Sequence, residues 1–190
     1  MAPSRPAADR TQRLVARSNL LIEQARFMTL ATVGPDGAWA STVNFVPLRG
    51  PLRLLWYSLR AARHSVDIEA DGRLSASLFM TGIDNELGLD GAQFTGTARA
   101  VGADELTALS QWYYERNFAD PQVREQWRLD RAEFEGRGPR RFYVVDVDAW
   151  WLFDLEGWLE DKNDRRIAVP LDRLHAPLPG EAAAEDVDRL

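Results

Sequence analysis

The chain has 190 residues, of which 45% are hydrophobic, and a formal net charge of −6 at pH 7. This length and composition fit one domain with a substantial core, and the lack of any long basic run argues against nucleic-acid binding. Zero cysteines exclude disulfides and thiolate chemistry, and two widely separated histidines argue against a multi-histidine metal site. We therefore expect no resident metal, and any redox chemistry must come from a bound organic cofactor.

The amino-terminal segment is polar and contains two prolines, so residues 1–12 are predicted to form a flexible tail. It lacks the apolar stretch of a signal peptide, and no apolar run is long enough to span a membrane, so we expect a cytoplasmic protein without membrane contact. Apolar residues recur at helical spacing from Leu14 to Ala25, which predicts an amphipathic helix. The single domain is expected over residues 13–175, followed by a second flexible tail at residues 176–190.

A β-hairpin is predicted between residues 27 and 46, because β-branched residues flank the strong turn signal GPDG. In its second strand two polar residues, Thr42 and Asn44, alternate with apolar Val43 and Phe45. Alternate residues of a strand share one face, so the hydrogen-bonding side chains gather on one side of the hairpin. That side either contacts a ligand or is simply exposed to solvent.

Four further strands are predicted from their apolar and β-branched content, at residues 52–58, 73–80, 93–101 and 141–154. A short helix follows the first of these, and a second helix begins near Asp104 after the third. The segment between residues 81 and 91 is rich in glycine and acidic residues and is predicted to be a loop. Six strands with peripheral helices predict a mainly β fold, an antiparallel six-stranded barrel.

The most informative stretch lies where a strand ending in Tyr57 and Ser58 leads into a short helix that carries Arg63 and His64. A strand end that opens onto a helix start gathers backbone N–H donors, a hydroxyl group and cationic side chains. That combination binds phosphate. The spacing alone also allows an ordinary strand, turn and surface helix with solvated side chains.

These residues resemble the phosphate-binding segment of the pyridoxamine 5′-phosphate oxidase-like family, the FMN-binding split barrels. In that family a strand ending in Tyr-Thr or Tyr-Ser precedes a helix with Arg-Lys or Arg-His, and an I-E-x-x-x-R-[VL]-S motif follows. Here the motif reads IEADGRLS from Ile68 to Ser75, without gaps. The hairpin and residues 93–101 match more loosely, so the resemblance covers about residues 14–118. It implies a split β-barrel that forms a homodimer, with each cofactor at the subunit interface.

The resemblance also implies roles for individual residues. Arg63 is expected to anchor the FMN phosphate with His64 and Ser58 beside it, and the strand from Thr42 to Phe45 is expected to line the flavin ring through its backbone. Gln93 corresponds to an amide that contacts the pyrimidine or the ribityl chain. The full predicted cofactor set is Thr42, Val43, Asn44, Phe45, Tyr57, Ser58, Arg63, His64 and Gln93.

The sequence departs from the family pattern at several positions. The serine that commonly precedes the Arg-Lys pair is Ala62 here, and the lysine is His64. The tryptophan and Arg-x-His-x-Arg pattern with which true pyridoxamine phosphate oxidases bind their substrate has no counterpart in the final third of the chain. We therefore expect an FMN-dependent oxidoreductase with a different small-molecule substrate, with NADH or NADPH as a candidate electron donor and no assigned catalytic side chain. A deazaflavin or haem in the same fold, and a non-enzymatic flavin-binding module, stay open as alternatives.

Overall fold

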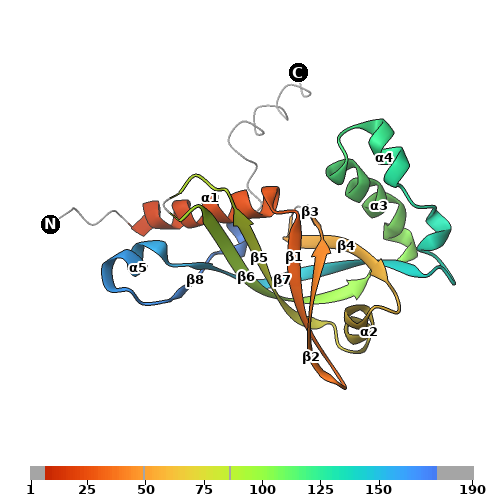
Figure 1. Ribbon diagram of the computed structural model, residues 1–190, viewed down its shortest axis with the longest axis horizontal. Coiled ribbons are helices and arrows are strands. Elements are labelled where there is room, and N and C mark those ends of the chain that lie inside the picture. The colour runs from red at the N-terminus through yellow and green to blue at the C-terminus, as the bar shows by residue number, and fades with distance from the viewer. Residues whose placement is uncertain (1–6, 49, 86, 175–190) are drawn as a thin grey trace.

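Figure 1 shows the computed structural model, which describes residues 7–48, 50–85 and 87–174. These residues form one antiparallel eight-stranded sheet in the order β2-β1-β5-β6-β7-β4-β3, with β8 paired to β7. The strands are β1 (Phe27–Gly34), β2 (Gly37–Asn44), β3 (Val46–Leu48), β4 (Arg53–Leu59), β5 (Arg73–Thr81), β6 (Leu89–Ala100), β7 (Arg140–Phe153) and β8 (Arg166–Ala168). The helices are α1 (Ala7–Gln24), α2 (Arg63–Ala70), α3 (Ala103–Asn117), α4 (Pro121–Trp127) and α5 (Leu155–Asp161).

The mainly β class with peripheral helices is confirmed, but the sheet has eight strands instead of the predicted six. One extra strand, β3, arises because the predicted second strand is interrupted at Phe45, whose N–H bonds to the carbonyl of Arg26 at 3.2 Å. The chain then crosses to the other end of the sheet and pairs with β4. As a result β2 and β3 form the two edges of the sheet, which is not a closed barrel.

The other extra strand, β8, pairs with the end of β7 and is only three residues long. It contains Arg166 and follows a charged segment, so no alternation of apolar residues marks it in the sequence. The pairing with β7 is a long-range contact that local pattern analysis does not detect.

The predicted amino-terminal tail is wrong in its second half, because α1 begins at Ala7. Residues 1–6 and 176–190, predicted as tails, lie outside the described residues. The early part of α1 is fixed by distant partners, since Arg10 binds Asp154 at 2.8 Å. No helix in the described ranges is long and apolar enough to cross a membrane.

Two apolar clusters lie on opposite faces of the sheet. The larger one contains two stacked aromatic pairs, Trp56 with Tyr143 and Phe94 with Trp150, each with ring centroids 5.7 Å apart. Helix α1 covers this cluster, and its Ser18 hydroxyl accepts a bond from the Trp150 indole at 3.0 Å. Figure 1 shows α1 and α5 at one end of the molecule and α3 and α4 at the other.

The smaller cluster forms where α3 packs on β3, β4 and the first half of β7. Phe142 of β7 and Tyr113 of α3 are both nearly completely buried there. Because neighbouring residues of β7 face opposite sides of the sheet, this strand contributes to both clusters. The two clusters therefore fix β4 from both faces, and the carboxyl end of β4 is positioned rigidly where α2 begins.

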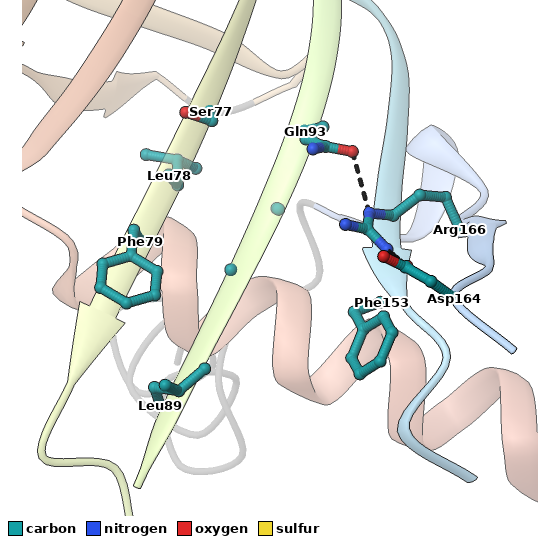
Figure 2. Close-up of a pocket in the computed structure, with 10 residues that line it drawn as sticks. Ser77, Leu78, Phe79, Leu89, Gln93, Phe153, Asp164 and Arg166 are labelled. Atoms are coloured by element: carbon teal, nitrogen blue, oxygen red, sulfur yellow. Dashed lines mark hydrogen bonds and ion pairs between the residues drawn. The ribbon is translucent and has the colours of Figure 1, made fainter. Parts of the chain in front are cut away.

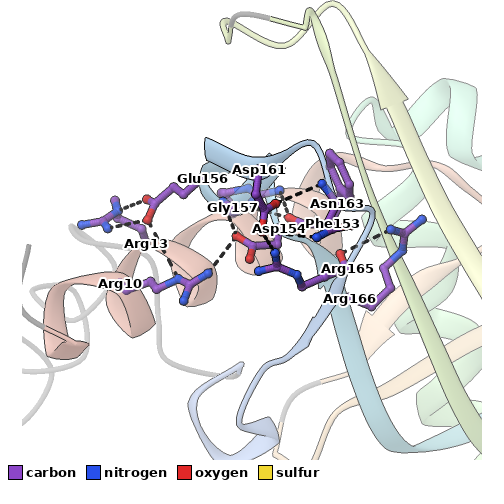
Figure 3. Close-up of polar contacts among 11 residues, drawn as sticks. Arg10, Arg13, Phe153, Asp154, Glu156, Gly157, Asp161, Asn163, Arg165 and Arg166 are labelled. Carbon is purple, nitrogen blue, oxygen red and sulfur yellow. Dashed lines mark hydrogen bonds and ion pairs between the residues drawn. The ribbon is translucent and has the colours of Figure 1, made fainter. Parts of the chain in front are cut away.

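Three arginines of α1 bind acidic residues of β6, of α5 and of the N-cap position before α5, and we call this group the arginine clasp. Figure 3 shows Arg10 and Arg13 reaching the acidic residues that begin α5. Each contact has an N–O distance of 2.8 Å. The pairs are Arg10 with Asp154, Arg13 with Glu156, and Arg17 with Asp90.

Candidate functional site

The end of β4 and the start of α2 bring together two of the residues predicted to bind phosphate. Ser58 has the same strand phase as Leu54 and Trp56, which belong to the larger core cluster, so it faces the inner side of the sheet. Its hydroxyl lies 2.8 Å from Nε2 of His64, the second residue of α2. The imidazole is only 9% exposed. The predicted neighbourhood of Ser58 and His64 is therefore present in the structure.

Arg63 begins the same helix, and its side chain extends toward the β1–β2 hairpin. Its Nη2 donates to the carbonyl of Gly37 at 3.0 Å, and its guanidinium carbon lies 4.7 Å from the centroid of the Trp39 ring. Gly37 has φ of +94°, a conformation that glycine adopts without strain and that shapes the turn. A carbonyl and an indole ring hold the guanidinium in place, but neither carries a compensating negative charge.

A buried carboxylate joins α2 to the hairpin next to this site. Asp67 is 3% exposed and accepts a hydrogen bond from the Thr32 hydroxyl at 2.8 Å. A Cβ at Gly34 would lie 2.0 Å from Asp67 Oδ1, so only glycine permits this close packing. Burial lowers the pKa of His64 below its ordinary value of 6.5, and the charge of Asp67 partly opposes that shift. The imidazole is therefore neutral at pH 7.

The first turn of α2 has backbone donors that no side chain caps. Ala62 is the N-cap residue, and it makes no side-chain bond to the helix, as expected for an alanine at this position. The first N–H groups of a helix have no partner within the helix and carry partial positive charge. They therefore add to the positive potential around Arg63.

The tyrosine predicted beside Ser58 is placed elsewhere. Tyr57 faces the opposite side of β4, where its ring packs against Tyr113, Phe134 and Phe142 with centroid distances of 5.2 to 5.4 Å. Strand alternation explains this separation, because consecutive residues point to opposite faces. The structure therefore brings Ser58 and His64 together but does not bring the Tyr57 ring to them.

The predicted ring-lining segment, Thr42 to Phe45, is the end of β2 and the residue that follows it. Val43 and Phe45 are buried in the core, at 8% and 2% exposure, so their side chains are not available to a ligand. The Phe45 N–H is also engaged, because it bonds to the Arg26 carbonyl. The side-chain amide of Asn44 is occupied by the protein itself. Its Nδ2 donates to the Arg26 carbonyl at 2.8 Å, and its Oδ1 accepts from the Tyr113 hydroxyl at 2.7 Å. Burial raises the pKa of Tyr113, which keeps that hydroxyl protonated as the donor.

Thr42 is the exposed member of this strand. Its hydroxyl lies 3.3 Å from that of Thr29 on β1. Counting from the two-residue turn, Thr42 and Thr29 form a non-hydrogen-bonded pair, so the backbone N–H and C=O of Thr42 point away from β1. In the described residues β2 pairs only with β1, and these two groups therefore face a free sheet edge.

Gln93 lies apart from the predicted residues at the start of α2, but the strand register places it on the same face of the sheet as Thr42, in the row Thr42, Thr29, Ser77, Gln93. Its neighbours Ala92 and Phe94 are in the core, so its side chain points to the outer face of the sheet, opposite to the face of Ser58. Its Oε1 accepts a hydrogen bond from Arg166 at 3.0 Å, within an open cleft shown in Figure 2. Within one protomer, the side chains of Gln93 and Ser58 therefore lie on opposite faces of the sheet.

Sequence reasoning missed three residues that shape the site around α2: Trp39, Thr32 and Asp67. A signal existed for Trp39, since its strand phase places it on the inner face with Val43. The partnership of Thr32 with Asp67 spans 35 residues and has no local signature.

Comparison with known proteins gives matches at the level of sequence family and of fold. The family profile described as pyridoxamine 5′-phosphate oxidase matches residues 15–154. Among curated proteins, no sequence matches the chain.

Three solved structures illustrate the shared fold. A haem-binding protein from Mycobacterium smegmatis superposes with a TM-score of 0.62 at 17% identity, over 90% of this chain and 61% of that one. The chain thus spans about three fifths of that protein. A haem storage protein from Vibrio cholerae gives 0.55 at 14% identity, over 75% and 94% of the two chains. A FAD-binding protein from Mesorhizobium loti gives 0.52 at 9% identity, over 71% and 90%.

Proposed function

Because the chain belongs to the pyridoxamine 5′-phosphate oxidase family, we propose that it binds FMN and uses it for oxidoreductase chemistry on a small molecule. The observation that carries the proposal is the setting of Arg63 at the start of α2. Its guanidinium contacts a carbonyl and an indole ring, and the next residue of the helix, His64, has its imidazole in contact with the Ser58 hydroxyl. A phosphate would receive charge-assisted hydrogen bonds there.

The residues present fit a phosphate-bearing cofactor. Arg63 would supply the permanent charge, Ser58 a hydroxyl donor, and His64 a second cation once it is protonated. The uncapped first turn of α2 adds backbone donors of the kind that favour anions. When bound, FMN supplies the electron transfer, and the protein contributes binding and orientation.

The free edge of β2 provides a second element of the proposed site. The N–H and C=O of Thr42 face this edge, so one donor and one acceptor are offered side by side. The pyrimidine edge of a flavin carries both acceptors and a donor, and a strand edge matches such an alternation. Within the segment from Thr42 to Phe45, we propose that the backbone groups that face this edge, and not the occupied amide of Asn44, contact the ring.

The proposed substrate differs from pyridoxamine phosphate. The Arg-x-His-x-Arg pattern is missing from the final third of the sequence, and β8 instead presents Arg166 to a glutamine and an aspartate. NADH or NADPH is a candidate electron donor.

We also propose a homodimer. The outer face of β1 exposes large apolar side chains, with Phe27 at 58% and Val33 at 69% exposure, and three exposed alanines, Ala31, Ala38 and Ala40, extend this surface onto β2. Apolar surface of this kind marks protein interfaces. Light scattering is expected to give twice the mass of one chain, and Val33→Lys is expected to shift the protein toward monomer.

The rival cofactors predict different outcomes. Haem is suggested by the names of two structural relatives, but in the described residues the one histidine, His64, is buried and its Nε2 is engaged by Ser58. A deazaflavin would be released with a different mass. A non-enzymatic flavin module would bind FMN that NADH and NADPH do not reduce.

The experiment is to purify the protein from a flavin-sufficient host, record its visible spectrum and measure the mass of the released ligand. We expect FMN in the wild type and its loss in Arg63→Ala. The matched control is Arg73→Ala, because Arg73 lies just after α2 and is already neutralised by Asp71 at 2.6 Å. A colourless wild type that also fails to take up added FMN would overturn the proposal.

A further inference from the structure

A hollow of about 250 Å³ lies between α3 and residues 128–134, the segment that follows α4. Two contacts fasten this segment to α3. The Leu129 N–H donates to the Tyr114 hydroxyl at 3.1 Å, and the Arg131 guanidinium donates to the Thr107 hydroxyl. Since Thr107 and Tyr114 are separated by about 10 Å of helix, the hollow lies between two fixed points of attachment.

The floor of the hollow is apolar. Leu106, Tyr114 and Phe134 line it, and each of these side chains is 4% exposed or less. The volume is slightly below that of a site for a drug-sized molecule, so the hollow fits a compact ligand with an apolar group.

One polar group of this floor has no acceptor for its proton. The Tyr114 hydroxyl accepts from the Leu129 N–H, but none of the described residues accepts from the hydroxyl. Burial raises the pKa of Tyr114, so the hydroxyl keeps its proton. Buried donors are normally satisfied, and this one therefore needs an acceptor from outside the chain.

Two charges of opposite sign line the same hollow without a buried partner. The Arg128 guanidinium carbon lies 5.5 Å from the centroid of the Tyr114 ring. In the described ranges the one carboxylate within 4 Å of this guanidinium is that of Glu125, which is 3.8 Å away and 81% exposed, so the pair contributes little. Asp130 precedes the short 3-10 helix Arg131–Glu133, but its carboxylate makes no hydrogen bond or ion pair with a described residue. Both charges are therefore available to a ligand.

We propose that this hollow binds a free α-amino acid with an apolar side chain. The ligand carboxylate would accept from Arg128 and from the Tyr114 hydroxyl, and the ammonium group would pair with Asp130. The apolar side chain of the ligand would cover the floor. A carboxylate alone would be repelled by Asp130 and an amine alone by Arg128, so the two charges favour a zwitterion.

The inference does not depend on the proposed flavin, because no residue that lines the hollow belongs to the predicted cofactor set. The test is calorimetric titration of the full chain with L-leucine at pH 7. Two analogues each lack one charge: L-leucinamide has no carboxylate, and 4-methylpentanoate has no ammonium group. We expect L-leucine to bind at least about tenfold more tightly than either analogue. No binding of L-leucine, or binding of either analogue as tight as that of L-leucine, would overturn the inference.

Two substitutions assign the charges of the ligand to their residues. Arg128→Gln is expected to make L-leucine and L-leucinamide bind equally, and Asp130→Asn is expected to make L-leucine and 4-methylpentanoate bind equally. Damage to the fold would instead weaken all three ligands alike, and a loss of the same size for all three would contradict the assignment.

The matched control is Arg137→Gln, because Arg137 is also exposed and follows the same segment but does not line the hollow. We expect this variant to bind all three ligands as the wild type does. A loss of selectivity as large as that of Arg128→Gln would show that the selectivity comes from the general charge of the region, and it would overturn the inference.

Competition with FMN separates this site from the cofactor site. Saturating FMN is expected to leave the affinity for L-leucine unchanged, and displacement of L-leucine by FMN would overturn the inference. FMN binding at α2 is decided by the spectra of the wild type and of Arg63→Ala, so the two proposals fail separately.

Discussion

The arginine clasp of α1 and the arginine that begins α2 have opposite surroundings. Arg17 in the clasp donates from both Nε and Nη2 to Asp90, at 2.8 Å each, and Asp90 is only 6% exposed. Arg63 has a carbonyl and an indole ring as its partners among the described residues. Both arginines are held by two contacts, but only the first is electrically compensated.

The difference separates arginines that stabilise the fold from one that is available to a ligand. A guanidinium paired with a buried carboxylate has little remaining attraction for an anion, and it contributes its energy to folding. A guanidinium held by neutral groups keeps its full charge in a defined position. We therefore expect substitutions in the clasp to change stability and substitutions near Arg63 to change FMN affinity.

The largest effect is expected from Arg17→Met, which leaves the Asp90 carboxylate buried without its partner. Removing one member of a buried pair costs about 3 to 5 kcal/mol, and the partial exposure of Arg17 places the expected loss near the lower end, about 3 kcal/mol. Urea denaturation measures the free energy of unfolding. FMN affinity of the folded variant is expected to stay unchanged, and a parallel loss of FMN affinity would break the comparison.

A second prediction gives Arg63 the carboxylate that it lacks. Trp39→Glu places an acid beside the guanidinium, whereas the matched variant Trp39→Gln removes the same ring without adding charge. Hydrogen bonds to charged groups contribute about 1.5 to 3 kcal/mol, so neutralising Arg63 is expected to weaken FMN binding about 30-fold relative to the glutamine variant. Fluorescence titration of FMN measures the ratio. Equal affinities would show that the charge of Arg63 is not used.

Local pattern was enough to predict the presence of all six long strands, α2 and the contact between Ser58 and His64, because each depends on neighbouring residues. The predicted loop at residues 81–91 is wrong at its end, because β6 begins at Leu89, which pairs with Thr81 of β5. The missed features depend on distant residues. Gln93 and its partner Arg166 are 73 residues apart, and no periodicity connects them. The start of α1 was missed for the same reason, since Arg10 is fixed by Asp154, 144 residues away. Family resemblance supplied the proposed function of the α2 segment, but it did not show that the side chains of Tyr57 and Gln93 point to the opposite face of the sheet from Ser58.

The third prediction concerns pH. Burial lowers the pKa of His64, so its imidazole is neutral at pH 7 in the free protein, and a bound phosphate favours the protonated form. FMN affinity is therefore expected to fall as pH rises from the pKa of free His64 to its higher pKa in the complex. The decrease is at most tenfold per pH unit.

His64→Lys is the control, because lysine keeps its charge over the same range and is common at this position in the family. The FMN phosphate has its own ionisation near pH 6, which affects both proteins equally, so the ratio of their affinities isolates His64. A constant ratio between pH 5 and pH 8 would contradict a role for the imidazole in binding the phosphate.

The smallest effect is expected at the exposed end of the clasp. Burial raises the pKa of Asp154, but the Gly157 N–H at 3.0 Å and Arg10 outweigh it, so the folded-state pKa lies below the ordinary value. Such a group stabilises the fold above its unfolded pKa, and that stabilisation is lost as pH falls through the folded pKa.

Asp154→Asn keeps an acceptor for the start of α5 but removes the charge. Since Arg10 is 44% exposed, we expect the variant to be less stable than the wild type by only about 0.5 kcal/mol at pH 7. Between pH 7 and pH 3 the variant is expected to lose correspondingly less stability than the wild type. Urea denaturation at the two pH values measures the free energies of unfolding. A variant as sensitive to acid as the wild type would show that this pair, unlike that of Arg17, contributes nothing to the fold.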